Sequence, residues 1–211
     1  MKYKVVLFDL DGTLTDPQEG ICKSINHAIS FFGAEEKPLN QLTKYIGPPL
    51  LGSLAELVGK ENAEEALVRY RERFSVIGLY ENQIYAGVKE TLEFLYTNGY
   101  ILCTASSKPQ VFVEKILKHF DIDKYFTIIG GASLDGRLNE KEDVIADVLG
   151  RLKADKKDIV MVGDTRFDLI GAEKMGLDAI GVTYGFGSKE ELSVYPHIAL
   201  IDNFSHIVNL L

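Results

Sequence analysis

Residues 5–15 read Val-Val-Leu-Phe-Asp-Leu-Asp-Gly-Thr-Leu-Thr, and the architecture of the chain follows from this run. Its first four residues are apolar strand formers, which predicts a short strand buried on both faces. Asp9 and Asp11 follow two residues apart, so strand geometry would point both carboxylates to the same side. Gly12 then permits a sharp turn whose backbone N–H groups are free to bind an anion. The run therefore predicts a strand that ends in an acidic, anion-binding turn.

Similar apolar runs recur downstream, and segments with helical periodicity separate them. The predicted strands are Ile101–Ala105, Ile159–Val162 and Ala179–Val182, and the predicted helices are Val88–Thr97, Gln110–His119, Val144–Leu152 and Leu169–Met175. Strands that alternate with helices indicate a parallel sheet built from βαβ units. We therefore expect an α/β fold with a Rossmann-like parallel sheet flanked by helices, whose ligands bind at the carboxyl ends of the strands.

Residues 16–81 interrupt this alternation. Asp16, Pro17 and Glu19 form a capping-box pattern that opens an amphipathic helix through Phe31. Further helices are predicted over Leu39–Tyr45, Leu50–Val58 and Glu61–Ile77. We therefore predict a core domain of residues 1–15 and 82–211, with a small all-helical cap domain of residues 16–81 inserted after the first strand.

Composition narrows the class of protein. The 211 residues are 46% hydrophobic and 26% charged, which is typical of a globular chain and excludes a disordered or disulfide-scaffold protein. The apolar runs are much shorter than the roughly 18 residues that a membrane span needs, and from the first residues of the sequence we expect no export leader. The net charge of −8 argues against binding a nucleic-acid polymer. We expect a cytoplasmic monomer or homodimer with reduced cysteines and no membrane contact.

A second pair of carboxylates follows another predicted strand. It lies in Val162-Gly163-Asp164-Thr165-Arg166-Phe167-Asp168. The carboxyl ends of parallel strands meet at one edge of a sheet. Four acids at the ends of two such strands are hard to explain as solvated surface, so we expect them to form a site.

In order and spacing, these residues resemble the four motifs of the haloacid dehalogenase superfamily of phosphohydrolases. The matching motifs are Asp9–Leu14, Ser106 in Ser106-Ser107-Lys108-Pro109, Lys141, and Asp164 with Asp168. The resemblance covers the whole predicted core, and the helical insert is similar to that family's small cap. It implies Mg²⁺-dependent hydrolysis of a small phosphorylated metabolite.

The resemblance also implies a role for each matching residue. Asp9 is the nucleophile that becomes an aspartyl-phosphate, Asp11 protonates the leaving alcohol and then deprotonates water, and Lys141 pairs with Asp9 and the phosphate. The residues implied to bind the transferring phosphoryl group are Gly12, Thr13, Ser106 and Ser107. The implied metal ligands are Asp9, the Asp11 carbonyl and Asp164, with Asp168 completing or supporting the shell.

Charge arithmetic gives an independent reason to expect a cation. Ionised Asp9, Asp164 and Asp168 with a phosphate dianion gather about five negative charges, and each pair about 4 Å apart costs roughly 4 kcal/mol at an effective dielectric near 20. Lys141 alone cannot offset that charge, whereas Mg²⁺ raises the local positive charge to about three. We therefore predict Mg²⁺ as the cofactor.

Several residues also have ordinary structural interpretations. Lys141 could belong to a charged helix start, and Ser106 or Ser107 could cap the helix that Pro109 opens. Thr104 competes with Ser106 for the phosphate role. We expect Lys108 and Arg166 to be solvated charges, and no histidine or cysteine is assigned to a site.

Substrate identity is less well determined. Ile46-Gly47-Pro48-Pro49-Leu50 is similar to the cap loop of phosphoglycolate phosphatases and the related 5′-nucleotidase-like branch, which implies that Gly47 and Pro48 contact the substrate. An ordinary interhelix turn explains this loop equally well. Four segments together resemble the nucleotidase-like branch more closely: Tyr45-Ile-Gly-Pro-Pro-Leu50, Ser107-Lys-Pro109, Leu134-Asp-Gly-Arg137 and Tyr184-Gly-Phe-Gly187. Tyr45, Phe31 or Phe186 could stack on a base or pack in the core. A phosphosugar mutase similar to β-phosphoglucomutase and a non-catalytic phosphate-binding module remain alternatives.

Overall fold

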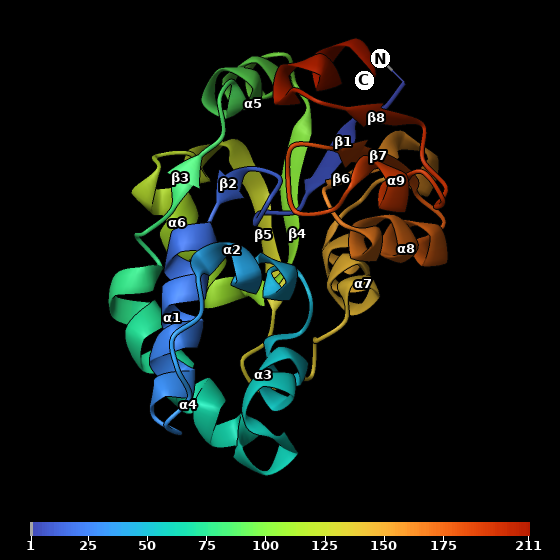
Figure 1. Cartoon of the computed structure of the whole chain (residues 1–211). Helices are drawn as coiled ribbons and strands as arrows, with labels where there is room; N and C mark the ends of the chain where they lie inside the picture. Colours follow the sequence, from blue (N-terminus) through green and yellow to red (C-terminus); the bar gives the residue numbers. More distant parts are fainter. Residues whose placement is uncertain (1) are drawn as a thin grey trace. The chain divides into compact units, whose positions relative to one another are not determined.

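The computed structural model describes residues 2–211 and divides into two compact units. One unit comprises the chain up to Thr15 together with Ile84–Leu211, and the other comprises Asp16–Gln83. The first unit is built on a β-sheet flanked by helices, and the second is helical (Figure 1). Two short strands, β2 (Thr15–Asp16) and β3 (Gln83–Ile84), pair where the chain passes from one unit to the other.

Within the described residues, the first unit contains a six-stranded sheet in the order β5-β4-β1-β6-β7-β8. Every neighbouring pair is parallel, which confirms the predicted α/β fold with a Rossmann-like sheet. The strands are β1 (Val5–Phe8), β4 (Ile101–Pro109), β5 (Phe126–Ala132), β6 (Ile159–Gly163), β7 (Asp178–Val182) and β8 (Ala199–Ile201). The chain runs outward from β1 to β4 and β5, then returns to β6 and continues the other way. β1 therefore lies beside the point where the strand order reverses, which is where ligands bind in open α/β sheets.

Helices cover both faces of this sheet (Figure 1). They are α5 (Val88–Thr97), α6 (Gln110–His119), α7 (Lys141–Arg151), α8 (Arg166–Met175), the short α9 (Lys189–Leu192) and the 3-10 helix η6 (Phe204–Asn209). Alternate residues of β1 serve the two faces. Val5 and Leu7 belong to the apolar cluster that includes Val144 and Val148 of α7, while the Phe8 ring lies 5.6 Å from that of Phe204 in η6. Burial on both sides explains why the strand is continuously apolar.

The sheet register brings the ends of β1 and β6 to one level, beside the middle of β4. Phe8, the last residue of β1, is paired with Thr104 of β4 on one side and with Val162 of β6 on the other. The residues that follow Phe8 and Val162 are therefore neighbours at the carboxyl edge. This register places the acidic turn after β1 beside the acidic turn after β6.

The second unit contains α1 (Gln18–Ser30), α2 (Leu39–Leu42), α3 (Leu50–Val58) and α4 (Ala63–Arg73). The predicted capping box at the start of α1 is wrong. The Asp16 carboxylate accepts a hydrogen bond from the Gln18 N–H at 3.0 Å, and the helix begins at Gln18, one residue later than predicted. Glu19 does not reach back to the cap, because its carboxylate pairs with Lys23 at 2.6 Å.

β5 and β8 were not among the predicted strands, although both belong to the sheet. Two consecutive glycines, Gly130 and Gly131, make β5 look like a loop in the sequence. The structure explains why glycine occupies both positions. A Cβ on Gly130 would lie 2.6 Å from the Thr104 carbonyl oxygen, and a Cβ on Gly131 would lie 2.7 Å from the Gln110 Cα. These glycines allow β4 and the start of α6 to approach β5 closely.

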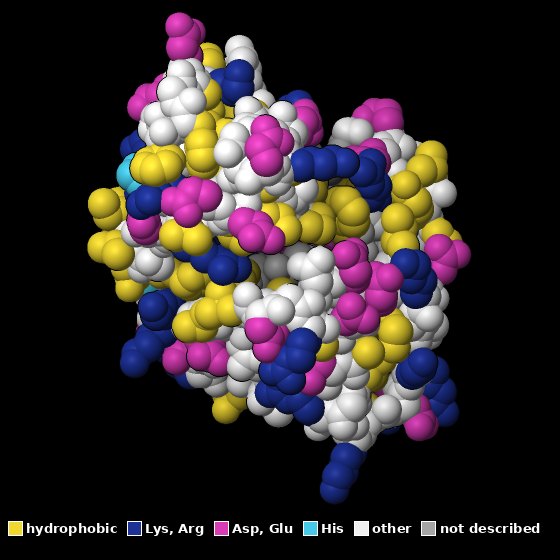
Figure 2. All heavy atoms as spheres, turned by 90° about the horizontal axis from the view of Figure 1, so that it is seen from below, with side chains coloured by type: hydrophobic (Ala, Val, Ile, Leu, Met, Phe, Trp, Pro, Cys, Tyr) yellow, Lys and Arg dark blue, Asp and Glu magenta, His cyan; other side chains and the backbone are white. Residues whose placement is uncertain are grey.

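The surface carries charges of both signs. Figure 2 shows Lys and Arg side chains interspersed with Asp and Glu side chains on the face drawn there. Across residues 2–211, the helices are all too short or too polar to cross a bilayer.

Candidate active site

Asp9, Asp164 and Asp168 converge at the carboxyl edge of the sheet. One carboxylate oxygen from each lies within 4.8 Å of the other two, and all three residues are buried. Asp9 directly follows β1 and Asp164 directly follows β6, as the strand register requires. Three carboxylates this close repel one another strongly unless a cation or protons intervene. The cluster is therefore a candidate metal and phosphate site.

Lys141 supplies the nearest positive charge. Its Nζ lies 3.0 Å from Asp9 Oδ1 and 2.8 Å from Asp168 Oδ1, and it donates a hydrogen bond to the Ala105 carbonyl oxygen at 3.0 Å. The side chain is only 3% exposed, so a solvated charge at the start of a helix does not describe it. Burial alone would lower the pKa of Lys141, but Asp168 and Asp9 outweigh burial and raise it above its ordinary value. Lys141 is therefore a permanent ammonium between two acids.

Asp168 has both carboxylate oxygens engaged. Its Oδ1 faces Lys141, and its Oδ2 accepts hydrogen bonds from the Thr165 N–H at 3.0 Å and the Thr165 hydroxyl at 2.9 Å. Thr165 is the residue before α8, so the carboxylate closes the first turn of that helix. Burial raises the pKa of Asp168, and Lys141 opposes that effect. These contacts make Asp168 a link between the helix start and the charged cluster.

Asp164 is fully buried and held by neutral groups. Its Oδ1 accepts from the Thr13 hydroxyl at 3.2 Å, and its Oδ2 accepts from the Phe186 N–H at 2.8 Å. Burial, together with repulsion from Asp168 and Asp9, raises the pKa of Asp164 well above its ordinary value. No lysine or arginine in residues 2–211 forms an ion pair with it within 4.0 Å. A divalent cation would supply the missing positive charge.

Glycines make room for Asp164. Gly12 has a φ of +85°, and a Cβ there would lie 2.0 Å from Asp164 Oδ2. A Cβ on Gly185 would lie 2.4 Å from the same oxygen. The loop after β7 is further held by Tyr184, whose hydroxyl donates to the Thr13 carbonyl oxygen at 2.8 Å. The sequence pattern Tyr184-Gly-Phe-Gly187, first noted for its resemblance alone, thus encloses an acid of the site.

Asp11 pairs with Lys108, which corrects the expectation that Lys108 is a solvated charge. The Lys108 ammonium donates a hydrogen bond to Asp11 Oδ2, and the two side chains are 6% and 13% exposed. Burial raises the pKa of Asp11, an effect that Lys108 partly opposes. The sequence offered one clue, since β4 delivers Lys108 to the same edge as Ser106. Arg166, by contrast, is 47% exposed and pairs with Glu191 at 2.9 Å.

Ser106 and Thr104 have different surroundings. Thr104 is fully buried, and its hydroxyl donates to the Gly130 carbonyl and accepts from the Gly130 N–H. Its hydrogen bonds therefore hold β4 to β5. Ser106 lies two residues nearer the carboxyl edge, and its hydroxyl oxygen accepts from the Lys108 N–H at 3.3 Å. Neither Ser106 nor Ser107 caps α6, which begins after Pro109 without a side-chain cap.

The remaining predicted residues belong to the helical unit. Gly47 has a φ of +104° and, like Pro48, is half-buried in the turn before α3. Tyr45 is buried and donates its hydroxyl to Glu56 at 3.0 Å, which makes it a packing residue of this unit. Phe31 is 57% exposed beneath the Arg69 guanidinium, which lies 4.1 Å from its ring centre. Substrate contact by Gly47 and Pro48 stays a prediction.

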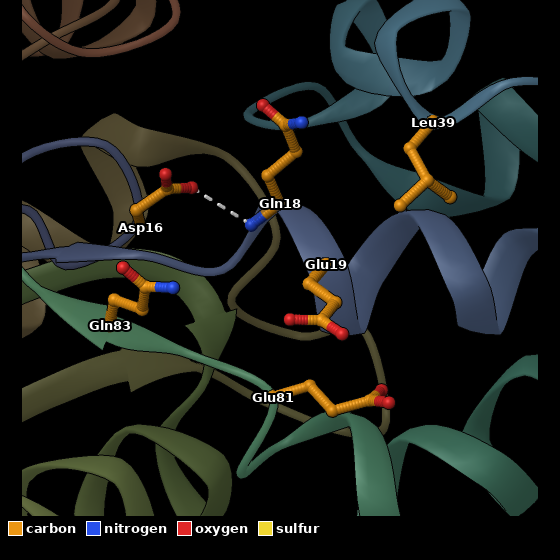
Figure 3. Close-up of a pocket in the computed structure, with 6 residues that line it drawn as sticks. All are labelled: Asp16, Gln18, Glu19, Leu39, Glu81 and Gln83. Carbon is orange, nitrogen blue, oxygen red and sulfur yellow. Dashed lines mark hydrogen bonds between the residues drawn. The ribbon is translucent and has the colours of Figure 1, made fainter.

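A hollow of about 220 Å³ lies within the helical unit (Figure 3). It is lined by Asp16, Gln18, Glu19, Leu39, Glu81 and Gln83. Two of its three acids already have cations: Arg73 lies 2.7 Å from Glu81, and Lys23 lies 2.6 Å from Glu19, while Asp16 accepts the hydrogen bond from the Gln18 N–H. These ion pairs explain the acidic lining without a ligand, so the aspartate cluster is the stronger candidate site.

Known proteins are similar to this chain over most of its length. A family model described as haloacid dehalogenase-like hydrolase matches residues 6–182. A Pseudomonas aeruginosa protein named 5′-nucleotidase is 44% identical over 197 residues, which cover 92% of this chain and 89% of that protein. A Mycobacterium tuberculosis protein named tyrosine-protein kinase PtkA is 39% identical over 204 residues, which cover 94% of this chain and 70% of that protein. A crystal structure described as a "predicted phosphatase from Clostridium acetobutylicum" superposes with a TM-score of 0.94 at 42% identity, covering 100% of this chain and 98% of that one.

Proposed function

Because the chain belongs to the haloacid dehalogenase-like hydrolase family and is one of its phosphoric monoester hydrolases, we propose that it hydrolyses a small phosphomonoester through a phosphorylated Asp9. The observation that carries this proposal is the meeting of Asp9 with Asp164 and Asp168, all buried, around Lys141. A buried carboxylate beside an ammonium, with further acids that suit a metal, has the composition of a phosphoryl-transfer site.

The two acids after β1 would share the chemistry. A carboxylate oxygen of Asp9 attacks phosphorus, the bond from phosphorus to the leaving oxygen breaks, and protonated Asp11 gives its proton to that oxygen. The products are the free alcohol and an aspartyl-phosphate. Asp11, now a carboxylate, takes a proton from a water molecule whose oxygen attacks phosphorus, and the Asp9–phosphorus bond breaks to release phosphate. The raised pKa of Asp11, caused by its burial, supports the acid role in the first step.

The donor set fits Mg²⁺, which prefers hard oxygen ligands. We propose that Asp9, Asp164 and the Asp11 carbonyl hold the ion. Asp168 would support the shell, because its oxygens are engaged with Lys141 and Thr165. When bound, Mg²⁺ offsets negative charge on the phosphoryl oxygens.

We propose a nucleoside 5′-monophosphate as the first substrate to test. Two observations support it: the likeness of Tyr184-Gly-Phe-Gly187 to the nucleotidase-like branch, and the 5′-nucleotidase that is 44% identical over most of this chain. Phosphoglycolate is the second candidate, on the resemblance of the Gly47–Pro48 loop. We propose no role for nucleic-acid polymers or membranes, and a cytoplasmic monomer or homodimer.

The test is a screen of the purified protein with Mg²⁺ over nucleoside monophosphates, phosphoglycolate, sugar phosphates and pyrophosphate. We expect release of inorganic phosphate and a kcat/KM for one class more than 10-fold above the rest, since a 10-fold preference is only about 1.4 kcal/mol. Asp9→Asn should abolish release. Absence of phosphate release from every ester would refute the proposal, and an isomeric sugar phosphate formed from a hexose 1-phosphate would identify a mutase instead.

A further inference from the structure

A buried lysine next to the proposed acid and base is not used by the mechanism above. Lys108 follows Ser106 on β4, and its N–H is tied back to the Ser106 hydroxyl at 3.3 Å. This bond directs the chain so that the Lys108 side chain, 6% exposed, reaches Asp11. A lysine buried to this degree costs free energy unless a specific partner compensates it.

The two lysines of the site serve different acids. Lys141 faces Asp9 and Asp168, whereas the ion pair of Lys108 is with Asp11. The two carboxylate oxygens of Asp11 therefore have different hydrogen-bond surroundings. Oδ2 accepts a hydrogen bond from Lys108, while Oδ1 is buried with no hydrogen-bond partner among residues 2–211. An orphaned buried carboxylate oxygen is unusual and calls for a role.

We propose that Lys108 is a positioning residue for Asp11: by binding Oδ2, it fixes the carboxylate so that Oδ1 is the oxygen that exchanges the proton. This inference rests on the proposed function and assigns the proton transfer to one atom. Asp11 sits on the turn at Gly12, where the backbone has a φ of +85°, and so has no regular strand to fix its side chain. Without Lys108, the carboxylate would be free to rotate away from the leaving oxygen.

Such a role has a kinetic signature that depends on the leaving group. An alkoxide leaves slowly unless it receives a proton, whereas nitrophenolate is stable enough to leave without one. A positioned general acid typically contributes 10²–10⁴-fold, and only where the proton is needed. Loss of positioning should therefore slow alkyl esters far more than aryl esters.

The experiment compares kcat/KM for an alkyl phosphate and for p-nitrophenyl phosphate in wild type, Lys108→Met, Lys108→Arg and Asp11→Asn. We expect Lys108→Met to lower kcat/KM about 10- to 100-fold more for the alkyl ester than for the aryl ester. Lys108→Arg should recover part of that difference. Asp11→Asn should also slow the alkyl ester more than the aryl ester. The double variant Asp11→Asn/Lys108→Met should show no larger difference between the two esters than Asp11→Asn alone, because both changes remove the same proton transfer. Lys124→Met, a change at an exposed lysine paired with Asp121, is the control and should leave the ratio unchanged.

Several results would overturn the inference. If Lys108→Met lowers both esters by the same factor, Lys108 has a structural role, and an equal rise in KM for both means that it binds the phosphate instead. If Lys108→Met does not fold, as judged by circular dichroism, Lys108→Arg is the deciding variant. The quantity compared is the ratio of kcat/KM for the aryl ester to that for the alkyl ester. A ratio as high as that of Asp11→Asn refutes positioning, and a ratio near that of the wild type supports it. A wild-type protein that hydrolyses neither ester would refute the proposed function itself, which is a separate outcome.

Discussion

Replacing Lys141 by Met tests whether this lysine offsets the charge of the aspartate cluster. Methionine keeps most of the side-chain volume and removes the ammonium that lies 3.0 Å from Asp9 Oδ1 and 2.8 Å from Asp168 Oδ1. In the absence of metal, the variant must either bury an uncompensated carboxylate or protonate one. Removing one partner of a buried ion pair typically costs 3–5 kcal/mol.

Protonation sets an upper limit on that cost. Neutralising one carboxylate at pH 7 costs about 1.4 kcal/mol for each pH unit above its ordinary pKa of about 3.9, which is about 4 kcal/mol. At pH 5.5 the same limit is about 2 kcal/mol. The hydrogen bond to the Ala105 carbonyl, which is also lost, adds about 1 kcal/mol at either pH. We therefore expect Lys141→Met to lower the free energy of unfolding by about 5 kcal/mol at pH 7 and by about 3 kcal/mol at pH 5.5.

Urea denaturation in EDTA, followed by circular dichroism at both pH values, measures these losses. The sign follows from proton binding: the folded variant holds a proton that the unfolded chain releases, so its stability falls as pH rises between the two pKa values. Lys174→Met is the matched control, because Lys174 pairs with Glu142 at 2.6 Å but is 56% exposed. Its unfolding midpoint should barely move. A Lys141→Met loss no larger than that of the control, or one that does not shrink at pH 5.5, would refute the reasoning.

Three further predictions concern the acids and the turn at Gly12. Gly12→Ala should cost about 1–2 kcal/mol for the left-handed backbone and should also weaken Mg²⁺ binding, measured by calorimetry, because its Cβ would lie 2.0 Å from Asp164 Oδ2. Gly99→Ala, at a φ of +83° with no atom within 4 Å of the added Cβ, should share the backbone cost and leave Mg²⁺ binding unchanged. Asp9→Asn should fold, as judged by circular dichroism, yet yield no acid-stable phosphoenzyme and no released phosphate; turnover by this variant would exclude Asp9 as the nucleophile. Mg²⁺ should raise the melting temperature of the wild type but not that of Asp164→Asn. In EDTA, Asp164→Asn should unfold at the same urea concentration as the wild type or a higher one, because it removes a buried charge that Asp168 and Asp9 repel.

The sequence predicted the parts of the fold that depend on local pattern. The apolar runs at β1, β6 and β7 and the helical periodicity of α5 and α6 were sufficient, because burial of a strand on both faces or of one side of a helix is recorded in consecutive residues. β5 escaped prediction because Gly130 and Gly131 are needed for close approach to other segments, and such long-range contacts leave no periodicity. The start of α1 was predicted wrongly because Glu19 had a better partner in Lys23 than the helix end.

The acids of the site were predictable for a different reason than its lysines. Asp9 and Asp164 each directly follow an apolar strand, so the topology of a parallel sheet brings them together without further information. The environment of Lys108 could not be derived in this way. Whether a lysine after β4 points into solvent or toward Asp11 depends on the turn that the Ser106 hydroxyl stabilises, and a sequence gives residue types but not the direction of a turn. The enclosure of Asp164 by the Phe186 N–H is likewise a backbone contact that side-chain identity does not encode.

The presence of Lys108 changes the charge balance from which a cation was first expected. With Asp11 protonated for its acid role, three ionised aspartates face two buried lysines, which leaves one uncompensated negative charge where Lys141 alone would leave two. One divalent cation would more than offset that remainder. A phosphate dianion would then meet a site of near-zero net charge instead of a strongly negative one, so its binding would depend on directed N–H and hydroxyl donors at the strand ends. On this argument the lysines and the metal remove the repulsion, while the turns after β1 and β4 provide the recognition.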